Sequence, residues 1–149
     1  MASGKGNNMS IGLLEMVFQA VQSADMANIL ENSSTSPITN LYVSLHNSSG
    51  PGAGGSQSTN ETAYTNYLRV AVARTTGGWS ISSETISNVG AVTFATCGAS
   101  GDTLTYVGIG TASSGAGILL WFGALSSNLA VSNGITPSFA AGQLAISES

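Results

Sequence analysis

Charged residues are scarce in this chain of 149 residues. Only 7% of its residues are charged, against roughly 25% in ordinary soluble domains. Three Lys and Arg residues against seven Asp and Glu residues give a net charge of −4. No basic stripe is present, which excludes direct binding to nucleic acid or to an anionic membrane. Because 42% of the residues are hydrophobic and patterned, disorder is also excluded. Such a surface suits a protein held in a large assembly or exposed outside a cell.

Cysteine and histidine each occur once. The single Cys97 excludes an intrachain disulfide, and we expect it to be buried as a small apolar residue. The single His46 excludes the usual histidine-based metal sites. Its position at the end of a predicted strand, on the face opposite the leucines, indicates a surface or interface residue.

Secretion and membrane signals are missing. The N-terminal MASGKGNN lacks the apolar core of a signal peptide. No run approaches the 18 or so apolar residues of a membrane span. We therefore expect a protein made in a cytoplasm, not secreted by the usual route and without a membrane partner.

Catalytic motifs are missing as well. No G-x-S-x-G elbow occurs and the seven carboxylates are scattered, so Glu61 and Glu84 are the only candidates for a hydrolytic pair. We predict a protein that is not an enzyme, with no catalytic residues, cofactor or metal. The two arginines, Arg69 and Arg74, are expected to meet carboxylates, within the subunit or across an interface.

The stretch GPGAGG, residues 50–55, formally matches the G-x-G-x-x-G nucleotide-binding pattern. That pattern requires a helix directly after the glycines and a carboxylate about 20 residues later. The glycines here run into SQSTNETAYTNYLRVAV, which is polar and then alternating. The stretch is therefore interpreted as a mobile surface loop between two strands.

The N-terminal part predicts a flexible arm over residues 1–8 and an amphipathic helix over residues 9–31. Ser10 is a plausible N-cap. Leu14, Val17, Phe18 and Val21 share one face of this helix, which either breaks near Ser23 or continues to Glu31, and SSTSP stops it.

From residue 37 to 149 the pattern is that of β-strands, with apolar and polar residues alternating and turns at short intervals. We predict a mainly β fold, an antiparallel sandwich or barrel of about eight strands, forming one globular domain with the helix. Asn133-Gly134 predicts a two-residue hairpin. The strand segments are LYVSLH, YLRVAVAR, a short strand from Trp79, AVTFATC, TLTYVGIG, GILLWFGAL, LAVS, ITPSFA and QLAIS.

Residues 118–125, ILLWFGAL, are apolar on both faces of the predicted strand. Such a strand is either central and covered, by the N-terminal helix or another element, or lies at a subunit interface. We predict that Leu119, Trp121 and Phe122 are core or intersubunit residues.

Four segments are informative as an ordered set, although none of them is specific alone: ITNLYVSLHNSSGPGAGG, YLRVAVAR, TYVGIGTASSGAGILLWFGAL and VSNGITPSFAAGQLAIS. Together, from about residue 38 to 146, they resemble a family of small virion proteins of tailed bacteriophages, described as capsid decoration (cement) or tail-fibre-like proteins. The resemblance implies a non-enzymatic structural protein of the virion, assembled as a homotrimer or another small symmetric oligomer.

Two hypotheses follow from this resemblance. The leading one is a capsid cement protein that staples major capsid subunits, with Ala2, Lys5 and Asn8 of the arm ordered against the shell. The alternative is a tail or fibre component that binds the host surface, through a pocket around Tyr64, Tyr67 and the 50–60 loop.

Overall fold

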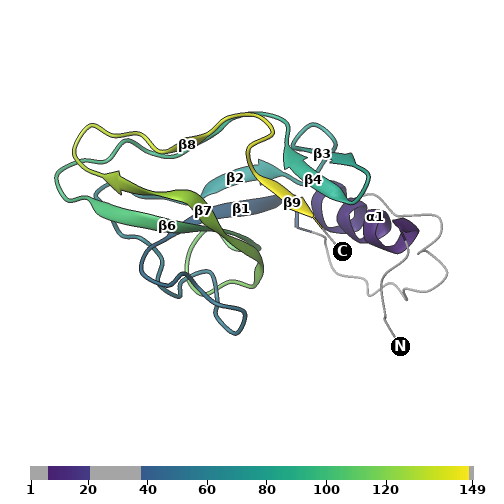
Figure 1. Cartoon of the computed structure of the whole chain (residues 1–149), viewed down its shortest axis with the longest axis horizontal. Helices are drawn as coiled ribbons and strands as arrows, with labels where there is room; N and C mark the ends of the chain where they lie inside the picture. The colour runs from purple at the N-terminus through teal and green to yellow at the C-terminus, as the bar shows by residue number, and fades with distance from the viewer. Residues whose placement is uncertain (1–6, 21–37, 148–149) are drawn as a thin grey trace. The chain divides into compact units, whose positions relative to one another are not determined.

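A computed structural model describes residues 7–20 and 38–147, and the side chains from residue 11 onward within these ranges (Figure 1). The chain forms two compact units. Unit 1 comprises Met1–Thr39, Ala73–Ala91 and Ala140–Ser149, and unit 2 comprises Asn40–Val72 and Val92–Phe139. Each unit is described by itself.

The described residues form one short helical segment followed by nine strands. The elements are α1 (Asn7–Leu14), η1 (Glu15–Gln19), β1 (Asn40–His46), β2 (Val70–Ala73), β3 (Trp79–Ser82), β4 (Thr85–Asn88), β5 (Val92–Thr93), β6 (Asp102–Gly110), β7 (Leu119–Val131), β8 (Ser138–Phe139) and β9 (Ala145–Ser147). The predicted mainly β, antiparallel fold is confirmed. The predicted barrel alternative is wrong, because the three sheets are open. Their strand orders are β2-β1-β6-β7, β3-β4-β9 and β5-β8.

The helical segment starts earlier than the sequence suggested. Asn7 already has helical backbone geometry, so Ser10 lies inside the helix and the N-cap prediction is wrong. The segment ends at Gln19, because Ala20 adopts the left-handed conformation with φ of 55° and its N–H bonds to the Glu15 carbonyl. Residues 21–31 of the expected helix lie outside the described residues.

Unit 1 is built around the apolar face of this segment. Leu14 and Phe18 are fully buried, as the periodicity predicted. The Phe18 ring meets the buried Trp79 of β3 edge-on, with ring centroids 4.6 Å apart, and the Gln19 amide donates to the Trp79 carbonyl over 2.9 Å. These contacts attach the helical segment to strand β3, which pairs with β4.

Unit 2 is built around the sheet β2-β1-β6-β7. Its core face carries Leu41, Val43 and Leu45 of β1, all fully or almost fully buried, which confirms the predicted alternation. In the antiparallel register Val43 lies opposite Ile109 of β6, and Ile109 lies opposite Trp121 of β7. Residues that are opposite one another share a face, so these three side chains form one apolar row across the sheet.

Two strand predictions are wrong. The strand predicted over YLRVAVAR is shorter than expected: β2 starts only at Val70, and Leu68 before it is 71% exposed. A turn does form at Asn133-Gly134, closed by a bond from the Ile135 N–H to the Ser132 carbonyl, but it makes no hairpin. The segment after it pairs with residues 92–97, since β8 is bonded to β5.

Strand β7 is not central. It lies at the edge of its sheet, with β6 on one side and no strand on the other among the described residues. The first of the two explanations for its doubly apolar sequence, a central position in the sheet, is therefore wrong.

Truncation of Phe18 tests the packing of unit 1. Phe18→Ala should lower the free energy of unfolding by about 3–5 kcal/mol, because it removes a fully buried ring and leaves a cavity. Val17→Ala, at a half-buried neighbour in the same segment, should cost much less. Urea denaturation measures both; equal losses for the two variants would contradict the packing described here.

Candidate functional site

Residues 47–60, which we call the covering loop, fold back over one face of the four-stranded sheet, where Gln57 and Thr59 bond to residues of β1. This loop contains the glycine-rich stretch. Gly50 has a φ of +69° and lies against the Tyr106 ring, so a Cβ there would come within 2.5 Å of the ring. No helix lies between β1 and β2, which confirms that the stretch is a loop and not a phosphate cradle.

The covering loop buries His46. The side chain is fully buried, with Nδ1 3.0 Å from the Thr59 carbonyl and Nε2 2.9 Å from the Ser44 hydroxyl. A carbonyl only accepts, so Nδ1 carries the proton. Gly108 makes room on the facing strand, since a Cβ there would lie 2.6 Å from Nε2. The expected surface or interface position of His46 is therefore wrong, and burial lowers its pKa.

Arg69 ties Glu61, the residue that directly follows the covering loop, to the β6–β7 connection, residues 111–118, which we call the turn loop. Its guanidinium binds both Glu61 oxygens, at 2.6 and 2.7 Å, and donates to the carbonyls of Ala112 and Gly115 at 2.8 and 2.6 Å. The Arg69 side chain is 2% exposed and that of Glu61 16%. The predicted meeting with a carboxylate is confirmed for Arg69, and the hydrogen bond that its guanidinium donates to Glu61 is the main reason why the pKa of Arg69 is raised.

Gln57 makes a second tie between the two loops. Its buried amide accepts from the Ala112 N–H at 2.9 Å and donates to the Tyr42 carbonyl at 3.2 Å. Its backbone N–H bonds to the Ala116 carbonyl at 2.8 Å. Sequence reasoning missed Gln57; the one signal was an amide side chain within a run of glycine, serine and threonine.

Asp102 anchors the base of the covering loop and was also missed. One carboxylate oxygen accepts from Asn47 at 2.8 Å and from the Thr62 hydroxyl at 2.7 Å. Burial by itself would raise the pKa of Asp102, but these bonds and backbone donors outweigh it and lower that pKa.

The expected aromatic pocket around Tyr64 and Tyr67 does not exist. Tyr64 is 2% exposed and donates to the Ala95 carbonyl. The Tyr67 hydroxyl donates to Glu61 at 2.8 Å and accepts from the Leu45 N–H at 3.0 Å, and burial raises its pKa. Both tyrosines are held inside unit 2 because their hydroxyls are used by their own chain.

The remaining polar candidates have structural surroundings. Glu61 and Glu84, the candidate hydrolytic pair, lie in different units. Glu61 binds Arg69 in unit 2, and Glu84 belongs to unit 1. Arg74 donates to the carbonyls of Ile38 and Met16, and burial lowers its pKa. Cys97 is 1% exposed, which confirms its prediction as a buried apolar residue.

The predicted interface residues fall into two groups. Leu119 and Trp121 are half-buried and Phe122 is 40% exposed, all three on β7. Asn8 lies within α1 instead of a preceding arm, and Ala2 and Lys5 lie outside the described residues. Their role as an interface stays a prediction.

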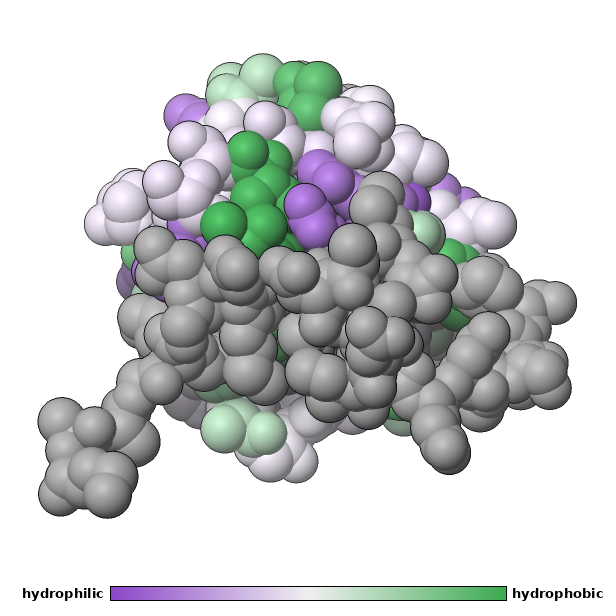
Figure 2. Space-filling model, turned by 90° about the vertical axis from the view of Figure 1, so that its right-hand side faces the viewer, coloured by the Kyte–Doolittle hydropathy of each residue, from purple (hydrophilic) through white to green (hydrophobic). Residues whose placement is uncertain are grey.

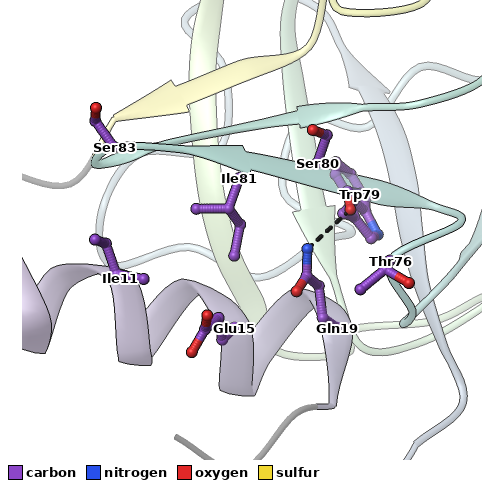
Figure 3. Close-up of a pocket in the computed structure, with 8 residues that line it drawn as sticks. All are labelled: Ile11, Glu15, Gln19, Thr76, Trp79, Ser80, Ile81 and Ser83. Carbon is purple, nitrogen blue, oxygen red and sulfur yellow. Dashed lines mark hydrogen bonds between the residues drawn. The ribbon is translucent and has the colours of Figure 1, made fainter.

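Unit 1 contains a shallow groove of about 400 Å³ between the helical segment and the β3 hairpin (Figure 3). The helical segment supplies Ile11, Glu15 and Gln19 to it, and the β3 hairpin supplies the other side. The Gln19 amide is already bonded to the Trp79 carbonyl, and the indole of Trp79 is fully buried. The groove therefore offers no exposed aromatic ring on which a ligand could stack.

The covering and turn loops together present an uncharged surface, and hydrogen bonds from Gln57 join the two loops. Neither 47–60 nor 111–118 contains a charged residue. We call their exposed residues the two-loop surface; chief among them are Ala53, Gly54, Ser58, Ser113, Ser114 and Ala116. Figure 2 shows the molecule from the right-hand side of Figure 1 instead, and the coloured part of that face mixes pale, green and purple residues. Loops held on a rigid scaffold are where proteins most often place binding functions.

Among the described residues, no three His, Cys, Asp or Glu side chains gather so as to hold a metal ion. None of the helices in the described ranges is long and apolar enough to cross a membrane.

The family described as Podophage GP4 fiber I protein gp80 matches residues 18–147, which is most of the chain. No curated protein matches the sequence.

Removal of the Arg69 guanidinium tests the tie between the loops. Arg69→Met should lower the free energy of unfolding by about 3–5 kcal/mol, because Glu61 stays behind without its partner. Adding Glu61→Gln should restore part of that loss. Hydrogen exchange should speed up at the Gln57 and Ala112 amides, whose bonds join the two loops. Unchanged exchange at these two amides would show that Arg69 does not hold the loops together.

The pH dependence of stability tests the buried His46. Its folded pKa lies below the ordinary value of 6.5, so between these two pKa values the unfolded state binds more protons. The free energy of unfolding should therefore fall as the pH drops below about 6.5. Asp102, whose pKa is lowered from 3.8, loses its contribution only in more acidic solution. Urea denaturation from pH 7.5 to pH 5 should show a flatter slope for His46→Gln than for the wild type; identical slopes would refute this.

Proposed function

The chain belongs to the family of Podophage GP4 fiber I protein gp80, and from this premise we propose that it is a tail-fibre component whose two-loop surface contacts the host cell. Membership makes the chain a structural component of a phage virion. The family description supports the fibre hypothesis over the capsid cement hypothesis. In this proposal its neighbours are other tail proteins rather than the major capsid protein, and it catalyses no reaction.

One observation carries the assignment to the two-loop surface: the chain fixes two long connections to each other with buried polar groups. Arg69 makes four hydrogen bonds to three residues on the two sides, and Gln57 bridges the same two loops. A surface that is ordered before contact loses little conformational entropy when it binds.

The chemistry of the surface sets what it contacts. It offers serine hydroxyls, backbone groups, small apolar residues and the exposed Ile118 at the end of the turn loop, and no charge. Such groups suit uncharged, hydroxyl-rich material on a cell surface. Because no ion pairs contribute, the contact should depend only weakly on salt concentration.

Phage particles that carry single substitutions in this protein test the proposal. Ala53→Arg and Ser114→Arg each place a long charged side chain at an exposed position of one loop. Each should slow the adsorption of the phage to host cells about tenfold or more, while the protein is incorporated into particles at the normal level. Ala141→Arg, at an exposed turn of unit 1, is the matched control and should leave adsorption unchanged.

The other outcomes are equally informative. Normal adsorption of both loop variants would overturn the host contact. Loss of the protein from the particle would show that these loops bind another virion protein. Electron microscopy with a gold-labelled antibody locates the protein on the virion. Label on the tail supports the proposal, and label spread over the head would support the capsid cement hypothesis instead.

A further inference from the structure

The groove of unit 1 contains one charged side chain, that of Glu15 (Figure 3). Ile11, Glu15 and Gln19 follow one another at intervals of four residues, so they lie on one face of the helical segment, and all three line the groove. Within the described ranges, no hydrogen bond or ion pair reaches the Glu15 carboxylate. The groove therefore carries a negative charge that this part of the chain leaves without a partner.

The two arginines of the chain are already used by other groups. Arg74, the one cation in the described part of unit 1, donates from its two terminal nitrogens to the carbonyls of Ile38 and Met16. Arg69 belongs to unit 2 and is 2% exposed in its pair with Glu61. A counter-charge for Glu15 must therefore come from outside the described residues.

The walls beside the carboxylate are apolar. Ile11 and Ile81 are both half-buried, and Figure 3 shows Ile81 pointing from β3 toward the helical segment. The other polar side chains that line the groove are uncharged and exposed: Thr76, Ser80 and Ser83. A lysine fits this combination, because its ammonium binds a carboxylate while its methylene stem covers apolar groups. An arginine fits less well, since its five donors need more acceptors than one carboxylate provides.

We propose that the groove of unit 1 is the docking site for a lysine side chain of a different protein of the virion. A second copy of this chain is a poor source, because the sequence contains one lysine, Lys5. The net charge of −4 leaves this chain with surplus carboxylates, which favours a basic neighbour. The inference rests on membership of a virion protein family and not on the proposed host contact, which uses unit 2.

The groove is formed before any partner arrives. Its two sides are joined by the edge-on contact of Phe18 with Trp79 and by the bond from the Gln19 amide to the Trp79 carbonyl. Trp79 itself is fully buried, so it holds the two sides in place. A site that is ordered in advance costs little conformational entropy when a side chain enters it.

Zero-length crosslinking of intact phage particles tests the occupant. A carbodiimide joins a carboxylate to a lysine amine as an amide only where the two groups touch. Mass spectrometry of treated particles should find Glu15 linked to a lysine of another virion protein, and particles that carry Glu15→Gln should lose this linked peptide. A link from Glu15 to Lys5, or no link at Glu15, would overturn the proposal.

Retention of the protein on particles tests the role of the charge. Glu15→Gln keeps the shape of the side chain and should lower the amount of protein left on salt-washed particles about tenfold or more, because the lysine of the partner loses its counter-charge. Glu84→Gln, in the β3–β4 turn of the same unit and not among the residues that line the groove, is the matched control and should be retained like the wild type.

Urea denaturation of the purified variants separates docking from folding. Glu15→Gln and the wild type should unfold at the same urea concentration, because the carboxylate has no partner among the described residues. Equal retention of Glu15→Gln and the wild type on particles, or a clearly lower urea midpoint for Glu15→Gln, would overturn the proposal. These measurements concern unit 1 and the particle, so they stand apart from the adsorption of the loop variants to host cells.

Discussion

The ion pair between Arg69 and Glu61 is the interaction on which the candidate site depends. A buried guanidinium is tolerated only when its donors are satisfied, and Arg69 meets this requirement with both oxygens of one carboxylate and two loop carbonyls. Glu61 is eight residues from Arg69 in the sequence, whereas Ala112 and Gly115 are 43 and 46 residues from it. The chain has only three basic residues, and one of them, Arg69, connects Glu61 at the end of the covering loop to the turn loop. This makes the relative position of the loops a fixed property of the fold.

The sheet beneath the loops is shaped for this arrangement. Alternate residues of β1 carry leucine and valine toward the core, and Ser44 and His46 toward the covering loop. The facing strand provides Gly108 and Gly110, where any Cβ would collide with polar side chains of the covered face. Space and hydrogen bonding are therefore satisfied together: glycines admit the loop, and the loop supplies carbonyls and amides to the polar groups that it buries.

The sequence was sufficient for local features and insufficient for long-range ones. Alternation predicted the core residues of β1, and helical periodicity predicted the burial of Phe18, because each pattern reports on one element. The burial of His46 depends on a loop that returns from residue 59, and the pairing of β8 with β5 depends on a partner about 45 residues away. Gln57 was missed for the same reason: nothing near it in the sequence shows that its amide meets Tyr42 and Ala112.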